Sequence, residues 1–125
     1  MALITTPLAT AVIGCAIRVH RALGPGLFES VYEPCLADEL SRGKIEFKRQ
    51  VSVPIKYGGR EIGPGFRLDF LIEEELVLEL KSVEKLLPVH EKQVLTYLKL
   101  TGLRKGLLMN FNASLLKQGI RSIVR

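Results

Sequence analysis

Three charged residues lie inside two stretches of the sequence that otherwise have the composition of buried β-strands. Asp69 lies in the mainly apolar run 66–72, and Glu79 and Lys81 lie in the mainly apolar run 76–83. Charged side chains are rarely fully buried unless they are paired or bind a metal ion. Any fold of this chain must therefore give these three charges partners.

The spacing of the charges predicts that they lie close together on a sheet. Side chains alternate across a strand, so Glu79 and Lys81 face the same side. The acidic turn 73–75 allows the two strands to pair antiparallel, which brings Asp69 near Glu79. Two carboxylates with main-chain carbonyls and water suit Mg²⁺ or Mn²⁺, and Lys81 could orient or deprotonate a metal-bound water. The alternative interpretation is an ion pair between acid and lysine on a half-exposed strand.

The periodicity of apolar residues predicts the element order ααβββαββ, an α/β (α+β) fold in which helices flank a mixed sheet. The chain of 125 residues is expected to form a single domain, residues 1–125. Helices are predicted from Thr5 or Thr6 to about Leu23, from Phe28 to Arg42, and from Pro88 to Gly102. Strands are predicted over about 46–57, 66–72, 76–83, 106–111 and 119–124.

Glycine and proline mark the turns between these elements. Pro54 predicts that the first strand lies at an edge of the sheet. Gly58 and Gly59 are typical of a hairpin turn, and the segment 63–65, Gly-Pro-Gly, is expected to interrupt the chain before the next strand.

Charge and cysteine content narrow the class of protein. Eighteen basic and 13 acidic residues give a net charge of +5, which favours a polyanionic partner. Cys15 and Cys35 have no CxxC spacing and are expected to be reduced core residues of an intracellular, cytoplasmic protein. Residues 1–17 carry no charge but lack a basic region ahead of the apolar run, so a buried first helix is predicted rather than a signal peptide or a membrane span.

Four motifs resemble one known group of proteins. Asp69 followed by Glu79-Leu80-Lys81 resembles the D…(E/D)xK signature of the PD-(D/E)XK nuclease superfamily, although residues 66–69 lack its proline. Residues 93–97, QVLTY, are similar to the QxxxY motif of its lambda-exonuclease and RecB-like branches. Residues 26–32, GLFESVY, match the GxxExxY motif of a small prokaryotic family in that superfamily, and residues 19–26 and 110–111 also look like that family.

The resemblance implies a restriction-endonuclease-like fold and a metal-dependent site. Asp69 and Glu79 would be ligands of Mg²⁺ or Mn²⁺ together with the main-chain carbonyl of Leu80, and Lys81 would be the catalytic lysine. Glu29 would support the metal directly or through water. The alternative for Glu29 is an acidic residue at a helix start, where negative charge is favoured in any case.

Four further residues are expected at the substrate or behind the metal ligands. Gln93 and Tyr97 lie four apart on one helical face, which touches the site or the substrate backbone in related nucleases; core packing is the alternative for Tyr97. His20 could contact a phosphate or a ligand, or could simply be a histidine at a helix C-terminus. Arg67 could line a phosphate track or be a solvated surface charge.

These features predict a metal-dependent nuclease whose partner is nucleic acid, DNA in preference to RNA, with no membrane association. The alternative is a catalytically silent module that keeps the fold to bind nucleic acid or a protein. An interaction or toxin-type accessory protein is a third possibility, supported only by the size of the chain. Leu-rich and Val-rich edges also suggest a homodimer.

Overall fold

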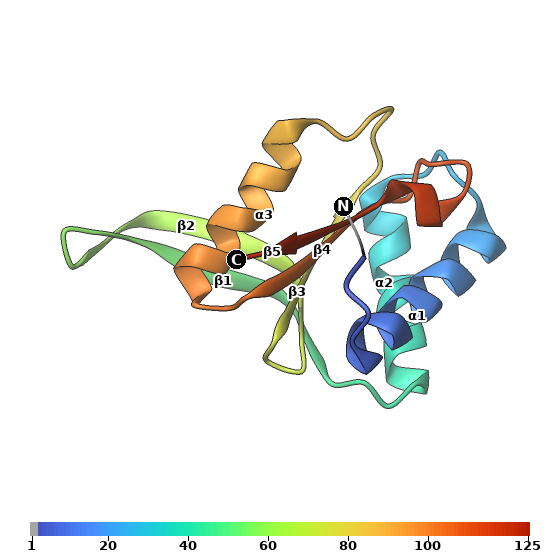
Figure 1. The fold of residues 1–125 in the computed structure, drawn as a ribbon, viewed down its shortest axis with the longest axis horizontal. Helices are drawn as coiled ribbons and strands as arrows, with labels where there is room; N and C mark the ends of the chain where they lie inside the picture. Colours follow the sequence, from blue (N-terminus) through green and yellow to red (C-terminus); the bar gives the residue numbers. More distant parts are fainter. Residues whose placement is uncertain (1–2) are drawn as a thin grey trace.

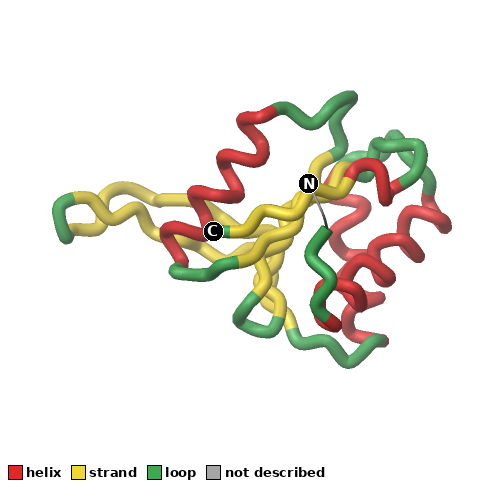
Figure 2. Tube along the Cα trace, viewed as in Figure 1, coloured by secondary structure: helices red, strands yellow, loops and turns green. Residues whose placement is uncertain are grey.

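The structure, a computed structural model, describes residues 3–125 as three α-helices around a five-stranded sheet (Figures 1 and 2). The elements in chain order are α1 (Pro7–Leu23), α2 (Glu29–Arg42), β1 (Phe47–Tyr57), β2 (Arg60–Ile72), β3 (Leu76–Lys81), α3 (Pro88–Thr101), β4 (Lys105–Asn110), the short 3-10 helix η1 (Leu116–Gly119) and β5 (Ile120–Val124). The predicted order ααβββαββ is confirmed.

The sheet is mixed, as predicted. Its strands follow the order β1-β2-β3-β4-β5, and all neighbours are antiparallel except β3 and β4, which are parallel. A parallel pair needs a long crossover connection, and the segment containing α3 supplies it. β1 lies at the edge of the sheet, which confirms the prediction from Pro54.

Helices cover both faces of the sheet, with α1 and α2 on one side and α3 on the other (Figure 1). The buried residues form two clusters. The α1/α2 core comprises Ala9, Val12, Cys15, Ala16, Val19, Tyr32, Leu36, Ala37, Leu40, Phe70, Ile72, Leu76, Leu78, Leu80, Leu107, Met109, Phe111, Leu116 and Ile120. The α3 core comprises Val53, Leu68, Val77, Val94, Tyr97, Leu98, Leu108 and Ile123. Along β3 the side chains alternate between the two cores, as the period of a strand requires.

The helix boundaries follow from local chemistry. The Thr6 hydroxyl accepts a hydrogen bond from Ala9 N at 3.2 Å and caps the start of α1, and Gly24, with a φ of 74°, caps its end. At the start of α3, His90 Nδ1 accepts a hydrogen bond from Leu87 N at 3.0 Å.

Within residues 3–125, none of the helices combines the length and apolar character needed to cross a bilayer. Cys15 is buried, Cys35 is half-buried, and both are free thiols.

The segment Gly63-Pro64-Gly65 does not precede a strand, as the sequence suggested, but lies inside the continuous strand β2. The pairing of β1 with β2 shifts register between Val53 and Ile55, so the extra residues form a bulge opposite Pro54. The predicted hairpin turn is confirmed, since Gly58 and Gly59 join β1 to β2 with φ values of 60° and 77°. Glycine and proline here bend a strand rather than end it.

Gly65 is the residue on which this bulge depends. A Cβ at this position would lie 2.0 Å from Val53 O, and its φ is 77°. We therefore expect Gly65→Ala to lower the free energy of unfolding by more than about 2 kcal/mol, because strain in the left-handed region adds to a main-chain clash. Gly63→Ala is the matched control: its φ is 68°, but nothing lies within 4 Å of the added Cβ, so about 1 kcal/mol is expected. Urea unfolding of both variants tests this, and equal losses would contradict it.

Candidate active site

The pairing of β2 with β3 stops at the charged residues. The β2–β3 register pairs Phe70 with Leu78, and one step further would place Asp69 opposite Glu79. At that step the Asp69 carboxylate accepts a hydrogen bond from Leu80 N, with Oδ2 2.8 Å from the nitrogen. A side chain thus replaces the main chain of β2 as the partner of β3. This fixes Asp69 beside Glu79 at the point where the two strands separate.

Asp69 also lies where the β1–β2 ribbon turns over. Leu68 and Phe70 are two residues apart, yet Leu68 packs in the α3 core and Phe70 in the α1/α2 core. The residue of β1 opposite Asp69 is Gln50, which has a φ of 53°. Gln50 and Asp69 do not form a regular β pair, although the neighbouring residues Arg49 and Phe70 do. A residue in the left-handed conformation changes which way a strand faces. The break in the alternation therefore coincides with the position of Asp69.

Glu33 of α2 holds this irregular rung in place. Gln50 Nε2 donates to Glu33 Oε1 at 2.6 Å, and Arg49 donates from Nε and Nη2 to Glu33 Oε2 at 3.2 and 2.8 Å. The Gln50 side chain is thereby held toward α2. Asp69 and Glu79 instead lie near Tyr97 of α3, whose pKa both carboxyl groups affect. The space beside Asp69 is thus not filled by the side chain opposite it.

Glu79 occupies an electrostatically unfavourable position. Its side chain belongs to a residue that is only 7% exposed. Burial raises the pKa of Glu79 to about 9, and the Asp69 carboxyl adds to the rise, while the Lys81 ammonium and the Tyr97 hydroxyl act in the opposite direction. Burial also raises the pKa of Tyr97 to about 12, with the neighbouring Glu79 as the second cause. At neutral pH and without a cation, Glu79 therefore holds a proton.

The donor set fits a hard divalent cation. Two adjacent carboxylates, one of them buried and resisting ionisation beside the other, would be relieved by a positive charge between them. Within residues 3–125, no three His, Cys, Asp or Glu side chains form a group able to hold a metal ion. A cation bound by Asp69 and Glu79 would take its other ligands from main-chain carbonyls, phosphate oxygens and water, as Mg²⁺ commonly does.

Glu29 reaches the end of β3 from α2. Tyr32 orders the loop before α2, because its hydroxyl donates to Gly24 O at 2.6 Å and accepts from Leu27 N at 3.1 Å. Glu29 follows this loop in the first turn of α2, and its Oε1 accepts a hydrogen bond from Ser82 N at 3.0 Å. Glu29 therefore contacts the residue directly after Lys81. It does not join the Asp69 and Glu79 carboxylates in a three-acid cluster within residues 3–125.

Asn110 is a residue of this region to which the sequence analysis assigned no role. It is 5% exposed and lies opposite Lys81 in the parallel pairing of β3 with β4. Its Oδ1 accepts a hydrogen bond from Val83 N at 3.0 Å, and its Nδ2 donates to Val83 O at 2.9 Å. Asn110 thus fixes the chain as it leaves Lys81. The signal in the sequence was a polar residue that follows directly on the apolar run 106–109.

The remaining predicted residues divide into those near the site and those away from it. Tyr97 is buried in the α3 core beside Glu79, and Gln93 lies exposed one turn earlier on the same helix. Arg67 is exposed on β2, two residues before Asp69. His20 is buried elsewhere: its Nε2 lies 2.8 Å from Ala113 O, and it packs near Phe111. The hydrogen bond of His20 is thus with the segment after β4, not with the carboxylates.

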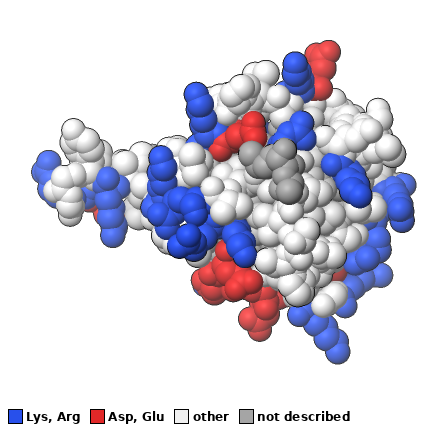
Figure 3. Space-filling view, in the orientation of Figure 1, with Lys and Arg blue, Asp and Glu red and all other residues white. Residues whose placement is uncertain are grey.

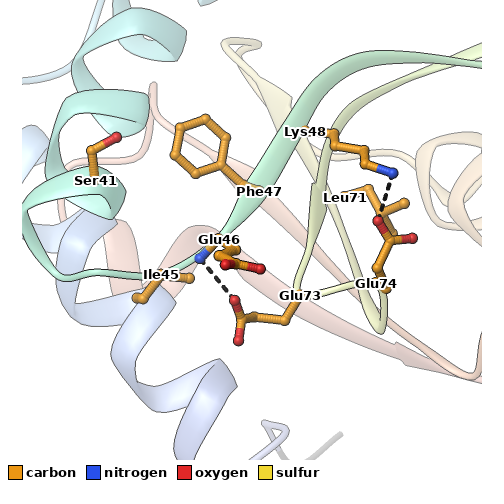
Figure 4. A pocket seen from close by; sticks show the side chains of 8 residues that line it. All are labelled: Ser41, Ile45, Glu46, Phe47, Lys48, Leu71, Glu73 and Glu74. Atoms are coloured by element: carbon orange, nitrogen blue, oxygen red, sulfur yellow. Dashed lines mark hydrogen bonds and ion pairs between the residues drawn. The ribbon is translucent and has the colours of Figure 1, made fainter.

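A separate pocket of about 390 Å³ lies at the other end of the β2–β3 pair (Figure 4). Two contacts cross it: Glu46 N donates to Glu73 Oε2 at 2.8 Å, and Lys48 forms an ion pair with Glu74 at 2.7 Å. Its lining residues are Ser41, Ile45, Glu46, Phe47, Lys48, Leu71, Glu73 and Glu74. Neither Asp69 nor Glu79 lines it, so this pocket is not part of the candidate site.

Comparison with known proteins gives one family match. The family profile of the PD-(D/E)XK nuclease superfamily matches residues 6–123, which include every element from α1 to β4 and nearly all of β5. No curated protein matches the chain, and no solved structure matches it.

The raised pKa of Glu79 predicts how stability depends on pH in the absence of metal. The folded-state pKa of about 9 lies above the ordinary value of 4.5, so folding takes up a proton between these values and stability falls as pH rises through this window. The glutamine in Glu79→Gln cannot ionise. The free energy of unfolding of this variant should therefore rise relative to that of the wild type between pH 5 and pH 8, by on the order of a few kcal/mol. Urea unfolding in EDTA measures this. Glu75→Gln, in the exposed turn, is the control, and a Glu79→Gln curve parallel to the wild type would refute the prediction.

Glu33 should matter for the site although its hydrogen bonds are with Arg49 and Gln50. Removing it in Glu33→Ala leaves Gln50 strained without its partner, which should cost about 1–3 kcal/mol of stability and weaken Mn²⁺ binding. Adding Gln50→Gly should restore Mn²⁺ binding, because glycine adopts a φ of 53° without strain. Glu39→Ala, which removes another α2 glutamate from an ion pair, should leave Mn²⁺ binding unchanged. Calorimetric titration decides, and failure of Gln50→Gly to rescue would argue against backbone positioning.

Proposed function

The chain belongs to the PD-(D/E)XK nuclease superfamily, and from this premise we propose that it is a Mg²⁺- or Mn²⁺-dependent nuclease that hydrolyses phosphodiester bonds of nucleic acid. The observation that carries the proposal is the grouping of Asp69, Glu79 and Lys81 where β2 and β3 separate, with the Asp69 carboxylate bonded to the β3 main chain. The raised pKa of Glu79, caused by burial and by Asp69, supports a site that gains by binding a cation.

Each residue of the proposed site has a chemical role that its surroundings allow. Asp69 and Glu79 hold the cation, together with the carbonyl of Leu80. A bound cation supplies a water of lowered pKa and neutralises charge on the phosphate. Lys81 lies on the same face as Glu79 and is half-buried, so its ammonium can orient the attacking water or stabilise the phosphate. Tyr97 keeps Glu79 in position from α3.

The neighbouring predicted residues act on the substrate side in this proposal. Glu29 supports the metal through the segment that begins at Ser82, to which it is bonded. Gln93 on α3 and Arg67 on β2 are exposed, and in this proposal they contact the nucleic-acid backbone. His20 is bonded to Ala113 O, which supports a packing role for it rather than a phosphate contact.

We further propose that the chain is a member of the GxxExxY group. The three residues that define the motif have separate structural tasks: Gly26 takes a φ of 94°, Glu29 accepts a hydrogen bond from the residue directly after β3, and Tyr32 orders the loop between α1 and α2. These tasks give a physical reason for each motif residue. The homodimer suggested by the sequence stays a prediction.

Loss of cleavage in single-residue variants is the test of this function. With Mn²⁺ and plasmid DNA, single-stranded DNA or RNA as substrate, Asp69→Asn and Lys81→Gln should each lower the cleavage rate by at least about 100-fold, because the cation or the proton transfer loses its partner. Asp38→Asn, which changes an exposed carboxylate of α2 in the same way, should cleave like the wild type.

Metal binding is measured alongside, by calorimetric titration of Mn²⁺. The wild type should bind Mn²⁺ and Asp69→Ala/Glu79→Ala should not, while circular dichroism shows that the variant is folded. Cleavage by Asp69→Asn at the wild-type rate would refute the assigned residues. Nucleic-acid binding without any cleavage by the wild type would instead favour the silent binding module.

A further inference from the structure

The two-stranded ribbon formed by β1 and β2 extends well beyond the sheet. β2 pairs with β3 only from Phe70 to Ile72, whereas it pairs with β1 from Arg60 onward. In the described part of the chain, residues 53–66, which we call the ribbon arm, therefore have no third strand beside them on the β2 side. Figure 1 shows the arm projecting from the body of the protein along its longest axis.

Little of the arm is packed against the rest of the protein. At its base Val53 is buried in the α3 core, and Phe66 lies 5.3 Å from Tyr97 between ring centroids. Toward the tip, Tyr57 is 74% exposed and Ile62 is 43% exposed. A two-stranded hairpin is only marginally stable in water by itself, and exposed apolar side chains at its tip do nothing for folding. The arm therefore has the features of a contact surface.

The charge at the tip is basic and unpaired. Lys56 and Arg60 are exposed on either side of the hairpin turn, and neither belongs to an ion pair within residues 3–125. Glu61 is the single acidic residue among residues 53–66, and it lies opposite Lys56 in the β1–β2 register without forming an ion pair with it, so the arm keeps a net positive charge. Figure 3 shows Lys and Arg atoms along this projecting end of the molecule. Exposed cations beside an exposed aromatic ring complement a polyanion that also presents flat apolar surface.

We propose that the ribbon arm enters the major groove of duplex DNA, with Lys56 and Arg60 contacting phosphates; the proposal rests on the nuclease function above and names its substrate class. The major groove of B-form DNA is about 12 Å wide and admits a two-stranded ribbon. The major groove of A-form RNA is deep and too narrow for this, so the shape of the arm selects DNA.

The strand β2 sets the reach of the arm from the site. Nine residue steps separate Arg60 from Asp69 along β2, which at about 3.3 Å per residue is at most roughly 30 Å. At about 3.4 Å per base pair, this length corresponds to at most about nine base pairs of duplex. A duplex of about eight base pairs centred on the site would end before Arg60 at the tip of the arm, and a much longer one would reach it.

The test measures binding in EDTA, so that it does not depend on cleavage. Lys56→Gln/Arg60→Gln should bind a fluorescent 30-base-pair DNA at least about 10-fold more weakly than the wild type at moderate salt. The slope of log K against log salt should become shallower by about 2, because each phosphate contact contributes about 0.9. The control Lys44→Gln/Lys117→Gln removes two exposed lysines from segments away from the arm and should bind like the wild type. An eight-base-pair duplex should not distinguish the variants.

Several outcomes would overturn the inference. Equal binding of the long duplex by wild type and arm variant would show that the arm does not touch DNA. An equal loss of affinity for duplex RNA would refute the selection of DNA by groove shape. Loss of self-association in sedimentation, without loss of DNA affinity, would make the arm a dimer contact. Cleavage with Mn²⁺ is scored separately. If the protein binds DNA as described but does not cleave it, the proposed nuclease function is refuted and the DNA-binding role of the arm stands.

Discussion

Where β2 leaves β3, the Asp69 carboxylate accepts the hydrogen bond of Leu80 N that a main-chain carbonyl would otherwise receive. The bond has two effects at once. It satisfies a buried amide of β3, whose loss would be costly, and it frees the β1–β2 ribbon to turn away from the sheet. It also keeps a carboxylate against Glu79. The same hydrogen bond therefore accompanies the separation of the two strands and brings the two acidic side chains together.

Under the proposed function, this arrangement gives up stability for chemistry. The resistance of Glu79 to ionisation beside Asp69 is an unfavourable feature of the metal-free fold. An apolar pair at the same positions would pack into the α3 core at lower cost. Sites that hold a reactive charge are commonly destabilising in this way. The contacts of Tyr97, Glu29 and Asn110 hold the chain around Glu79 and Lys81 in one geometry.

The sequence was sufficient for the order of elements and for the proximity of Asp69 and Glu79, because both follow from alternation along a strand and from turn residues. It was not sufficient for the bulge at Gly65 or the left-handed Gln50. Those features depend on the partner strand and on Glu33 of α2, and no local pattern reports a contact between segments so far apart. The role of Asn110 was missed for the same reason, since its partner Val83 lies in a different part of the chain.

The two hydrogen bonds between the Asn110 side chain and the Val83 main chain have a consequence for folding during synthesis. A growing chain that has emerged only as far as β3 already carries Asp69, Glu79 and Lys81. It lacks β4, the strand that pairs in parallel with β3, and it lacks the amide side chain that fixes the segment after Lys81. Parallel pairs form late because their partners are distant in sequence. Asp69 and Glu79 therefore emerge from the ribosome before β4 can pair with β3 beside them.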